Sequence, residues 1–451
     1  MDQNETLNSG VIADVKRRIE QMFYTGNREI GDQEPEQQSD ISQQAWLYFV
    51  AFLALENLIL RLEGKPTIRL NDGVTSLSHG LITECGRLVF RGAENWVYIY
   101  VHEHFCLVEL PWDSAWTWYL AVLGVDFCYY WLHRACHEVH ILWAQHQVHH
   151  SSEEYNLPVG LRHSILQNWC GFIFYVPLAL VIPPAQFLTH QHINFLYQIW
   201  VHTRVVSTLG PLEWILNTPR HHRVHHGCNL YCLDKNYGGF LIIWDRIFGT
   251  FAEEHKDEAI IYGLVHNQPS FNPVFLQLFY NVNVIKKWKA MNGWQDKLAA
   301  IWKGPSWLPG KPRLGATEDK LDIRSREKYD MKLPVWINIY LCLHFVALVI
   351  VYQELALKYS DMTPLAVLGF VTYILVSQTV IGMMFDNRPH TCIFELTRCV
   401  IFVFYVHKSD LTLQGRSSIT LLQPFFILSS CFWILQTFRV LHTEVKKIKK
   451  E

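Results

Sequence analysis

Three groups of histidines recur at spacings that suit a helix and that could hold metal ions. An HxxxH motif is followed closely by one HxxHH motif, and a second HxxHH motif comes much further along the chain. Residues three and four apart share one helix face, so the imidazoles of each group converge. The eight candidate catalytic and metal-ligating residues are His133, His137, His146, His149, His150, His222, His225 and His226.

These imidazoles predict a centre of two metal ions. Imidazole suits iron, zinc, copper and nickel, and eight ligands could be shared between two ions. A zinc hydrolase typically uses about three ligands and a carboxylate base, as in HExxH. The string His137-Glu138-Val139-His140 lacks that spacing. The pattern therefore favours a redox-active pair of ions.

His202 stands apart from the three motifs but is a further candidate ligand. It lies near the end of an apolar stretch that is expected to cross the membrane, where an ionisable side chain suggests function. We expect His202 to complete the metal shell. For His163 the sequence favours neither a ligand nor a non-ligand role. Six other histidines are interpreted as polar surface or core residues: His102, His104, His140, His190, His192 and His221.

The composition indicates a membrane protein rather than several soluble domains. Half of the 451 residues are hydrophobic and only 18% are charged, against roughly 25% in an average soluble domain. The net charge is −2, so no basic field points to nucleic acid. The 11 cysteines are scattered and form no small disulfide framework.

The apolar stretches predict an all-α polytopic membrane protein with about nine transmembrane helices. The expected crossings are 46–62, one between 74 and 110, 116–131, 168–184, 187–209, 334–352, 365–384, 391–406 and 419–438. Because the fourth and fifth form a helical hairpin, all three histidine groups would lie on one membrane face. The basic stretch after His255 indicates that this face is cytosolic.

From Trp118 to Phe251 the chain resembles the fatty-acid hydroxylase and sterol desaturase superfamily of all-histidine diiron membrane enzymes. The resemblance rests on HRACH at 133–137, HQVHH at 146–150, and the run from Pro219 through NYG to WDRIFGTF. Three further segments are most similar to the superfamily members that cleave ether lipids. They are HEVHILWAQHQVHHSSEEYNL, LYQIWVHT and LGPLEWILNTP.

The resemblance implies two Fe²⁺ ions that activate O₂, with tetrahydrobiopterin as the electron donor. The substrate would be a 1-O-alkylglycerol or its lyso-phospholipid, drawn from the bilayer and hydroxylated beside the ether oxygen. The products would be a fatty aldehyde and a glycerol derivative. Glu138 matches a glutamate linked in the family to pterin use. Arg204 departs from the family, in which we expect an acidic residue directly after His-Thr.

The same features divide the chain into six segments. They are a polar N-terminal segment (1–43), N-terminal transmembrane helices (44–112), a fatty-acid-hydroxylase-like catalytic domain (113–255), a cytosolic basic loop (256–333), C-terminal transmembrane helices (334–438) and a basic cytosolic tail (439–451). Lys447 and Lys449 stand fifth and third from the end, as in a retrieval signal for the endoplasmic reticulum. We expect a multi-pass protein of that membrane whose active site faces the cytosol.

Two alternative functions stay open at this point. A sterol or fatty-acyl hydroxylase or desaturase fed by a cytochrome would share the same metal site. A metal transporter would spread its histidines through the crossings, whereas the main clusters here lie at helix ends. The sequence is compatible with a homo-oligomer as well as with a monomer.

Overall fold

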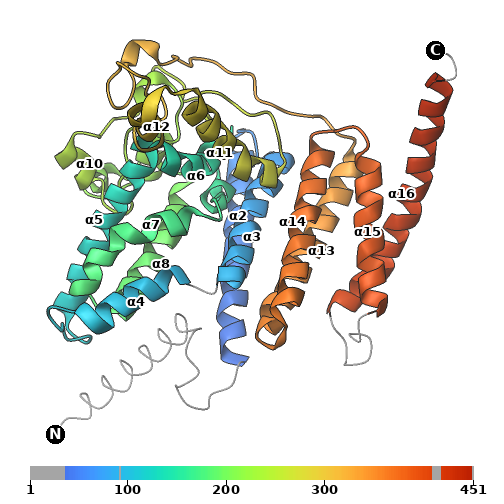
Figure 1. Ribbon diagram of the computed structural model, residues 1–451, viewed down its shortest axis with the longest axis horizontal. Coiled ribbons are helices and arrows are strands. Elements are labelled where there is room, and N and C mark those ends of the chain that lie inside the picture. The colour runs from blue at the N-terminus through green and yellow to red at the C-terminus, as the bar shows by residue number, and fades with distance from the viewer. Residues whose placement is uncertain (1–35, 91–92, 409–417, 449–451) are drawn as a thin grey trace, which may run out of the picture. The chain divides into compact units, whose positions relative to one another are not determined.

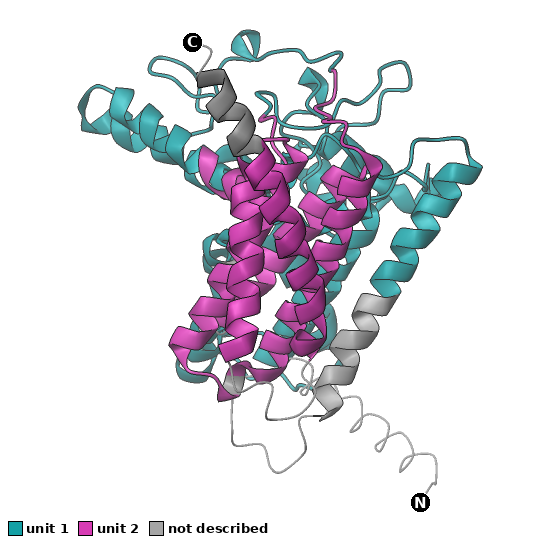
Figure 2. Ribbon diagram, turned by 90° about the vertical axis from the view of Figure 1, so that its right-hand side faces the viewer, with its two compact units in different colours: residues 1–68, 90–267, 280–326 teal, residues 69–89, 268–279, 327–451 magenta. Residues whose placement is uncertain are grey.

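The computed structural model describes residues 36–90, 93–408 and 418–448, and within them the chain is helical without β-strands. This confirms the all-α prediction. Most of the polar N-terminal segment and the end of the basic tail lie outside the described residues. The chain forms two compact units, coloured in Figure 2: unit 1 contains residues 1–68, 90–267 and 280–326, and unit 2 contains residues 69–89, 268–279 and 327–451.

Unit 1 contains the three histidine motifs and is a bundle of helices joined by long ordered loops (Figure 1). Helix α5 packs against α6, α7 and α8. The α-helices of this unit are α2 (Glu36–Leu62), α4 (Ala93–Phe105), α5 (Ala115–Glu138), α6 (His140–His150), α7 (Gln167–Tyr175), α8 (Pro184–Val201), α9 (Pro219–His225), α10 (Ile243–Phe248), the second part of α11 (Pro273–Ala290), and α12 (Gly293–Trp302). Its 3₁₀ helices are η1 (Leu157–Leu161), η2 (Val176–Leu180), η3 (Gly210–Trp214), η4 (Leu230–Cys232) and η5 (Thr317–Asp319).

One extended residue separates α5 from α6 and sets the angle between two histidine motifs. Val139 has φ −122° and ψ 118°, so it caps the end of α5 and the start of α6 at once. The backbone N–H of His140 then donates to the carbonyl of Lys303 at 2.9 Å instead of to a carbonyl of α5. The HxxxH motif on α5 therefore faces the HxxHH motif on α6 across this break.

Unit 2 holds the C-terminal helices. They are α3 (Leu70–Phe90), the first part of α11, α13 (Val335–Lys358), η6 (Tyr359–Asp361), α14 (Pro364–Phe385), α15 (Thr391–Lys408) and α16 (Ser418–Ile448). Helix α14 begins with Thr363, whose hydroxyl accepts from the N–H of Ala366 at 3.3 Å, and with proline at its first position. Helices α15 and α16 pack against each other over much of their length.

Three helices in the described part of the chain are long and apolar enough to cross a membrane: Val335–Lys358, Pro364–Phe385 and Ser418–Arg439. They coincide with three of the expected C-terminal crossings, and they support a membrane protein. The other six crossings stay predictions. The fourth expected crossing is broken into α7 and η2, because Pro177 lies at the start of η2 and has no N–H to donate.

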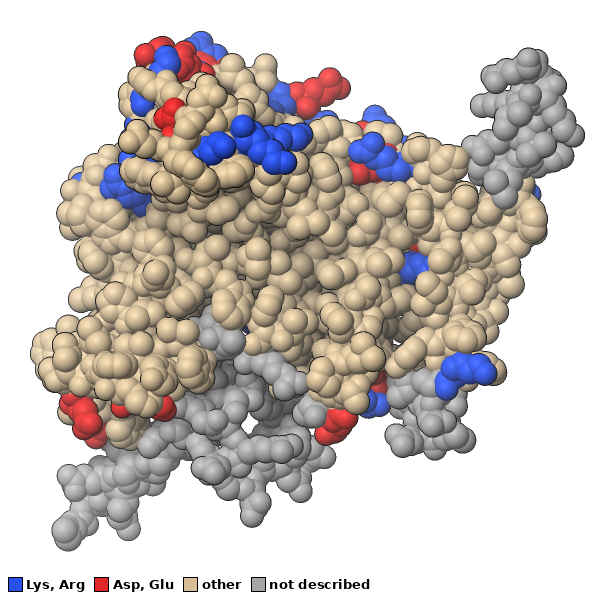
Figure 3. Space-filling view, viewed as in Figure 1, with Lys and Arg blue, Asp and Glu red and all other residues tan. Residues whose placement is uncertain are grey.

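Helix α5 carries an exposed apolar stripe, and its expected crossing stays a prediction. Six large apolar side chains at helical spacing point away from the core of unit 1: Trp116, Tyr119, Leu120, Leu123, Phe127 and Trp131, with exposed fractions from 36% to 76%. A stripe of this kind is expected where lipid rather than water covers a helix. On the face shown in Figure 3, charged side chains of unit 1 gather at two ends and leave an uncharged band between them.

Candidate metal centre

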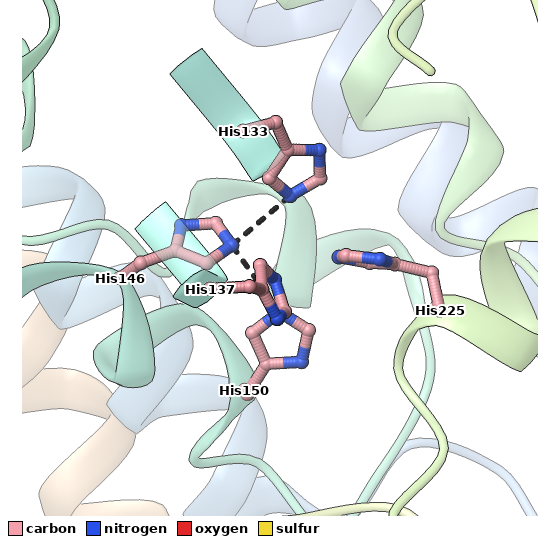
Figure 4. A group of neighbouring side chains, drawn as sticks. All are labelled: His133, His137, His146, His150 and His225. Carbon is pink, nitrogen blue, oxygen red and sulfur yellow. Dashed lines mark hydrogen bonds between the residues drawn. The ribbon is translucent and has the colours of Figure 1, made fainter. Parts of the chain in front are cut away.

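Nine buried histidines of unit 1 form two groups in which one nitrogen from each ring lies within 4.8 Å of the others. The first histidine group contains His133, His137, His146, His150 and His225, and Figure 4 shows their rings turned toward one another. The second histidine group contains His149, His202, His222 and His226. The structure thus brings together all nine candidates named from the sequence.

The HxxHH motif of α6 divides its histidines between the two groups. His146 and His150 are four residues apart, share a helix face and join the first group. His149 precedes His150 directly, so it points about 100° away around the helix axis and joins the second group. One short helix therefore serves two sites.

Helix α9 repeats this division in the opposite sense. His222 and His226 join the second group, whereas His225 crosses to the first. The helix begins at Pro219, whose missing N–H costs nothing at a first helical position. Because each HxxHH motif gives its outer pair to one group and its middle histidine to the other, the two groups are neighbours held by the same helices.

The remaining members come from α5 and from the end of α8. His133 and His137 are one turn apart on α5 and complete the first group with a pair. His202 caps the C-terminal end of α8 and completes the second group alone. His163, left open by the sequence, stacks on His149 at 5.0 Å between ring centroids and belongs to neither group.

In the first group the ring nitrogens that point to the middle of the group face one another at close range. His133 Nε2 lies 3.0 Å from His146 Nε2, which lies 3.2 Å from His150 Nε2 (Figure 4). The buried Nε2 atoms of His137 and His225 have no hydrogen-bond partner among the described residues. Five ring nitrogens therefore converge on one small space.

The second group is equally tight. His202 Nε2 lies 3.0 Å from the Nε2 atoms of His222 and His226 and 3.2 Å from that of His149. The Nε2 atoms of His226 and His149 are 3.0 Å apart. Four inner nitrogens thus surround one point.

In each ring the hydrogen bond that Nδ1 makes outside the group decides whether Nε2, inside the group, carries a lone pair. His133 Nδ1 lies 2.8 Å from the carbonyl of Tyr237, and His225 Nδ1 lies 2.8 Å from that of Lys235. His202 Nδ1 bonds in the same way to a carbonyl one turn back in α8. A carbonyl only accepts, so each Nδ1 donates and each neutral ring keeps a lone pair at Nε2. Lone pairs that face one another repel, and a bound cation would remove that repulsion. The donor set therefore fits metal ions.

Burial keeps the rings in the form that binds metal. Burial lowers the pKa of His149 and His226 well below the usual value, and nearby imidazoles lower it further. The pKa of His146, His222 and His225 is lowered for the same reasons. Neutral imidazole is the ligand form, so these side chains need not lose a proton to bind an ion at neutral pH.

The loop after α9 is built to present the carbonyl that His133 uses. Asp245 accepts from the N–H groups of Tyr237 and Gly238 at 2.8 and 2.6 Å and from the hydroxyl of Thr250 at 2.7 Å. A Cβ at Gly238 would lie 2.5 Å from the carbonyl oxygen of Leu241. Only glycine fits there, which accounts for the NYG and WDRIFGT strings.

Asp126 fastens the same loop to α5. Its carboxylate accepts from the backbone N–H of Phe240 at 2.7 Å, from that of Leu241 at 3.1 Å and from the indole of Trp244 at 2.8 Å. A helix that carries two histidines of the first group is thereby held against the loop that orients one of them.

Side-chain carboxylates often orient such rings, and the sequence offers four candidates for this role: Asp126, Asp234, Asp245 and Glu153. The structure shows that backbone carbonyls orient His133, His225 and His202, while Asp126 and Asp245 act through the loop. Asp234 lies 3.8 Å from His137 Nδ1, and Glu153 accepts from Asn267 instead. Backbone carbonyls leave no residue signature, so no sequence signal could have identified them.

Glu138 is held by two arginines. Its Oε1 accepts from Arg134 Nε at 2.7 Å, and its Oε2 accepts from Arg313 Nη1 at 2.6 Å. The residue is 8% exposed. Both carboxylate oxygens are thus in use. Oε1 holds Arg134 on the same helix, and Oε2 fastens the segment around Arg313 to the end of α5, directly after His137. The expected pterin contact stays a prediction.

The acidic residue beside the second group, Glu56 of α2, was not among the site residues predicted from the sequence. Glu56 is buried and accepts from the hydroxyl of Thr203 at 2.6 Å and from the N–H of Leu157 at 3.1 Å. Thr203 follows His202 directly. Arg204, the departure noted above, donates to the carbonyl of Pro66 at 3.2 Å. Glu56 thus positions the turn that carries His202.

Comparison with known families matches two parts of the chain. Residues 118–250 match the fatty acid hydroxylase family. Residues 337–441 match the alkylglycerol monooxygenase C-terminal domain. The first match covers every member of both histidine groups, and the second covers most of α13 to α16. No solved structure matches the chain.

Two relatives named alkylglycerol monooxygenase are similar to the chain over nearly its full length. Alkylglycerol monooxygenase of Xenopus tropicalis is 43% identical over 96% of this chain and 98% of its own length. The human protein of that name is 41% identical over 95% of this chain and 96% of its own length. Ornithine lipid hydroxylase OlsE of Rhizobium tropici is 32% identical over only 36% of this chain and 49% of its own length. The chain therefore belongs to the alkylglycerol monooxygenase family.

Proposed function

We propose that this chain is a membrane diiron monooxygenase that cleaves the ether bond of alkylglycerols and lyso-alkylglycerophospholipids. The observation that carries the proposal is the pair of histidine groups, whose inner nitrogens converge and three of whose rings keep a lone pair at Nε2. Similarity to alkylglycerol monooxygenases over nearly the whole chain supports the choice of substrate.

The nine histidines would hold two Fe²⁺ ions, one in each group. When bound, such a pair supplies the activation of O₂ that an unactivated C–H bond requires and that no side chain can provide. The protein contributes neutral imidazoles, fixes three of their rings through backbone carbonyls, and excludes water by burying all nine. Fixed rings keep the ligand positions from shifting during turnover.

The overall reaction balances with tetrahydrobiopterin as the two-electron donor. One oxygen atom of O₂ enters the C–H bond beside the ether oxygen, and the other leaves as water. The resulting hemiacetal loses its hydroxyl proton to the ether oxygen as the C–O bond breaks. A fatty aldehyde and a glycerol derivative result.

Glu138 remains our candidate for the pterin side of the site. Its carboxylate adjoins His137, and one of its partners, Arg313, has a side chain that is 42% exposed. A pterin that donates to Glu138 would replace Arg313, whereas Arg134 one turn earlier on α5 would keep its contact. The carboxylate would thus stay oriented while its second oxygen changes partner.

The proposal also places the protein in the endoplasmic reticulum membrane, with about nine crossings and the active site facing the cytosol. The three long apolar helices and the exposed stripe of α5 support membrane insertion. The basic segment before α13 and the lysines at the end of the sequence support the orientation. The six segments outlined from the sequence, with the catalytic domain at 113–255, belong to this proposal, and a homo-oligomer is compatible with it.

A reductant assay tests this function. Purified full-length protein in lipid nanodiscs is given a 1-O-alkylglycerol, O₂ and either tetrahydrobiopterin or a reduced cytochrome, and the released fatty aldehyde is trapped and measured. We expect aldehyde only with the pterin, and none from the His149→Ala variant. Aldehyde formed with the cytochrome and not with the pterin would contradict the proposal and favour a cytochrome-fed hydroxylase or desaturase.

A further inference from the structure

The end of α11 and all of α12 concentrate positive charge on unit 1. Between residues 282 and 303 the sequence has five lysines and one aspartate, although the whole chain has a net charge of −2. In the view of Figure 3, Lys and Arg side chains gather where Figure 1 places these two helices. We call residues 282–303 the basic aromatic surface.

The α11 part of this surface is apolar and cationic on the same face. Val282, Ile285, Lys286 and Lys289 stand three, four and seven residues apart, which is the spacing of one helix face. Val282 is 47% exposed and Ile285 is 52% exposed. Both lysines are exposed too, whereas Val284 on the opposite side is buried. The exposed face is therefore not the one that packs into the protein.

Helix α12 continues the pattern with large aromatic side chains. Trp294, Leu298 and Trp302 follow one another at intervals of four and are 71%, 56% and 50% exposed. The opposite face is buried through Ala299 and Ala300, and the helix packs against α6. Exposing two tryptophans and a leucine on one face to water is unfavourable in free energy.

Lysine ammonium groups lie against these indoles. Lys297 Nζ is 4.8 Å from the ring centroid of Trp288 and 5.7 Å from that of Trp294. Lys303 Nζ is 5.8 Å from the ring centroid of Trp302. Indoles favour the headgroup layer of a membrane, and lysines extend their ammonium groups toward phosphates from the same depth. The combination suits a lipid surface better than bulk water.

We propose that the basic aromatic surface docks onto a leaflet that contains anionic phospholipid. Its tryptophans and Ile285 would lie among the headgroups, and its lysines would bind the lipid phosphates. The excess of positive charge argues against a second copy of the chain as the occupant, because like charges would be brought together. An amphipathic basic element of this kind is typical of helices that lie in the plane of the interface.

This docking would fix the depth of the metal centre relative to the bilayer. The ring of His140, the first residue of α6, donates to the carbonyl of Ala300 at 2.8 Å, and its backbone N–H donates to the carbonyl of Lys303 at 2.9 Å. The same helix α6 carries three histidines of the two groups. A lipid surface at α12 is therefore one helix away from the centre.

Hydrogen exchange on the full-length protein tests the proposal without any turnover. The protein is placed in nanodiscs of phosphatidylcholine alone or with increasing phosphatidylserine, and amide exchange is followed in peptides from 282–303. We expect slower exchange with phosphatidylserine. A lysine near an anionic surface contributes about fivefold to binding. The Lys286→Gln/Lys289→Gln/Lys297→Gln variant should therefore need far more phosphatidylserine to reach half-maximal protection.

A matched variant removes the same charge elsewhere. Lys256, Lys332 and Lys408 are exposed and lie outside the basic aromatic surface, and their replacement by glutamine should leave the protection unchanged. Exchange that is equal in both lipids would overturn the proposal. Protection that appears only when two copies share a nanodisc, whatever the lipid, would also overturn it and would assign the surface to self-association.

Discussion

Buried histidines in the two units differ in what their ring nitrogens can still do. In unit 2, His344 lies close to Glu395 and Cys399, in an arrangement that by distance alone could also hold an ion. In unit 1, nine histidines meet in two groups at similar distances. Proximity of potential ligand atoms is therefore common to both regions.

The hydrogen bonds separate the two cases. Arg398 can only donate, and its Nη2 lies 2.8 Å from His344 Nδ1, so the proton of this ring is on Nε2 and faces the hydroxyl of Ser429 at 3.0 Å. Glu395 is paired with the same arginine. No lone pair of His344 is left for a metal, and the guanidinium would repel one. In unit 1 the rings of His133, His225 and His202 direct their protons outward to carbonyls and their lone pairs inward. Free lone pairs, rather than proximity, mark the metal centre.

The largest expected effect separates two adjacent histidines of α9. His222→Ala removes an inner nitrogen of the second group, so we expect loss of measurable turnover and of one bound ion. His221 is also buried but belongs to neither group, so His221→Ala should keep both ions and most activity. The test measures aldehyde release and metal content in both purified variants. Equal losses of turnover and bound metal in the two variants would contradict the assignment of His222, but not His221, to the ligands.

A second pair of variants tests the ligand that lies outside the three motifs. His202→Ala should lose turnover as completely as His222→Ala, because the second group has only four members. His163→Ala removes a ring that stacks on His149 without joining a group, so it should retain activity within roughly tenfold. Full activity in His202→Ala would remove that residue from the ligand set.

A smaller effect is expected where the loop that orients His133 is loosened. Asp245→Ala removes the acceptor of three hydrogen bonds, of which two hold Tyr237 and Gly238 and one holds Thr250. Loss of such support typically costs about 10–100-fold in metal affinity or activity. Iron titration of the metal-free protein measures this, with the exposed Asp257→Ala as control. An unchanged iron affinity would show that the carbonyl of Tyr237 needs no help from Asp245.

The smallest effect should come from the histidine of unit 2. His344→Ala removes one hydrogen bond each from Arg398 and Ser429, which keep Glu395 and the carbonyl of Phe425 as partners, and the loss of a buried partner costs about 1–3 kcal/mol. We expect a lower thermal unfolding temperature and an unchanged metal content. If iron were lost from this variant, His344 would have to be counted among the ligands, and the comparison between the two units would fail.

The ligand types and spacings were predictable from the sequence, but their division between two groups was not. HxxHH shows that three imidazoles share part of a helix face; it does not show how that face is turned toward its neighbours. The break at Val139 and the packing of α5, α6 and α9 make that choice. Glu56 was missed because it lies 147 residues before its partner Thr203.

The fold was predictable in a similar way. Three of the C-terminal crossings are uninterrupted apolar stretches and appear as long apolar helices, whereas 391–406 contains Glu395 and Arg398. The stretch at 168–184 is equally apolar, but Pro177 divides it into α7 and η2. Between residues 256 and 333 the sequence suggested only a basic loop, whereas two helices form there. Their apolar side chains are mixed with lysines, which obscured the helical period.

Metal analysis of the purified full-length protein tests the central claim most directly. Elemental analysis combined with Mössbauer spectroscopy gives the metal, its amount and whether the ions are coupled. With one ion in each histidine group, we predict about two coupled iron ions per chain. A single ion per chain, or zinc in place of iron in active protein, would contradict the account.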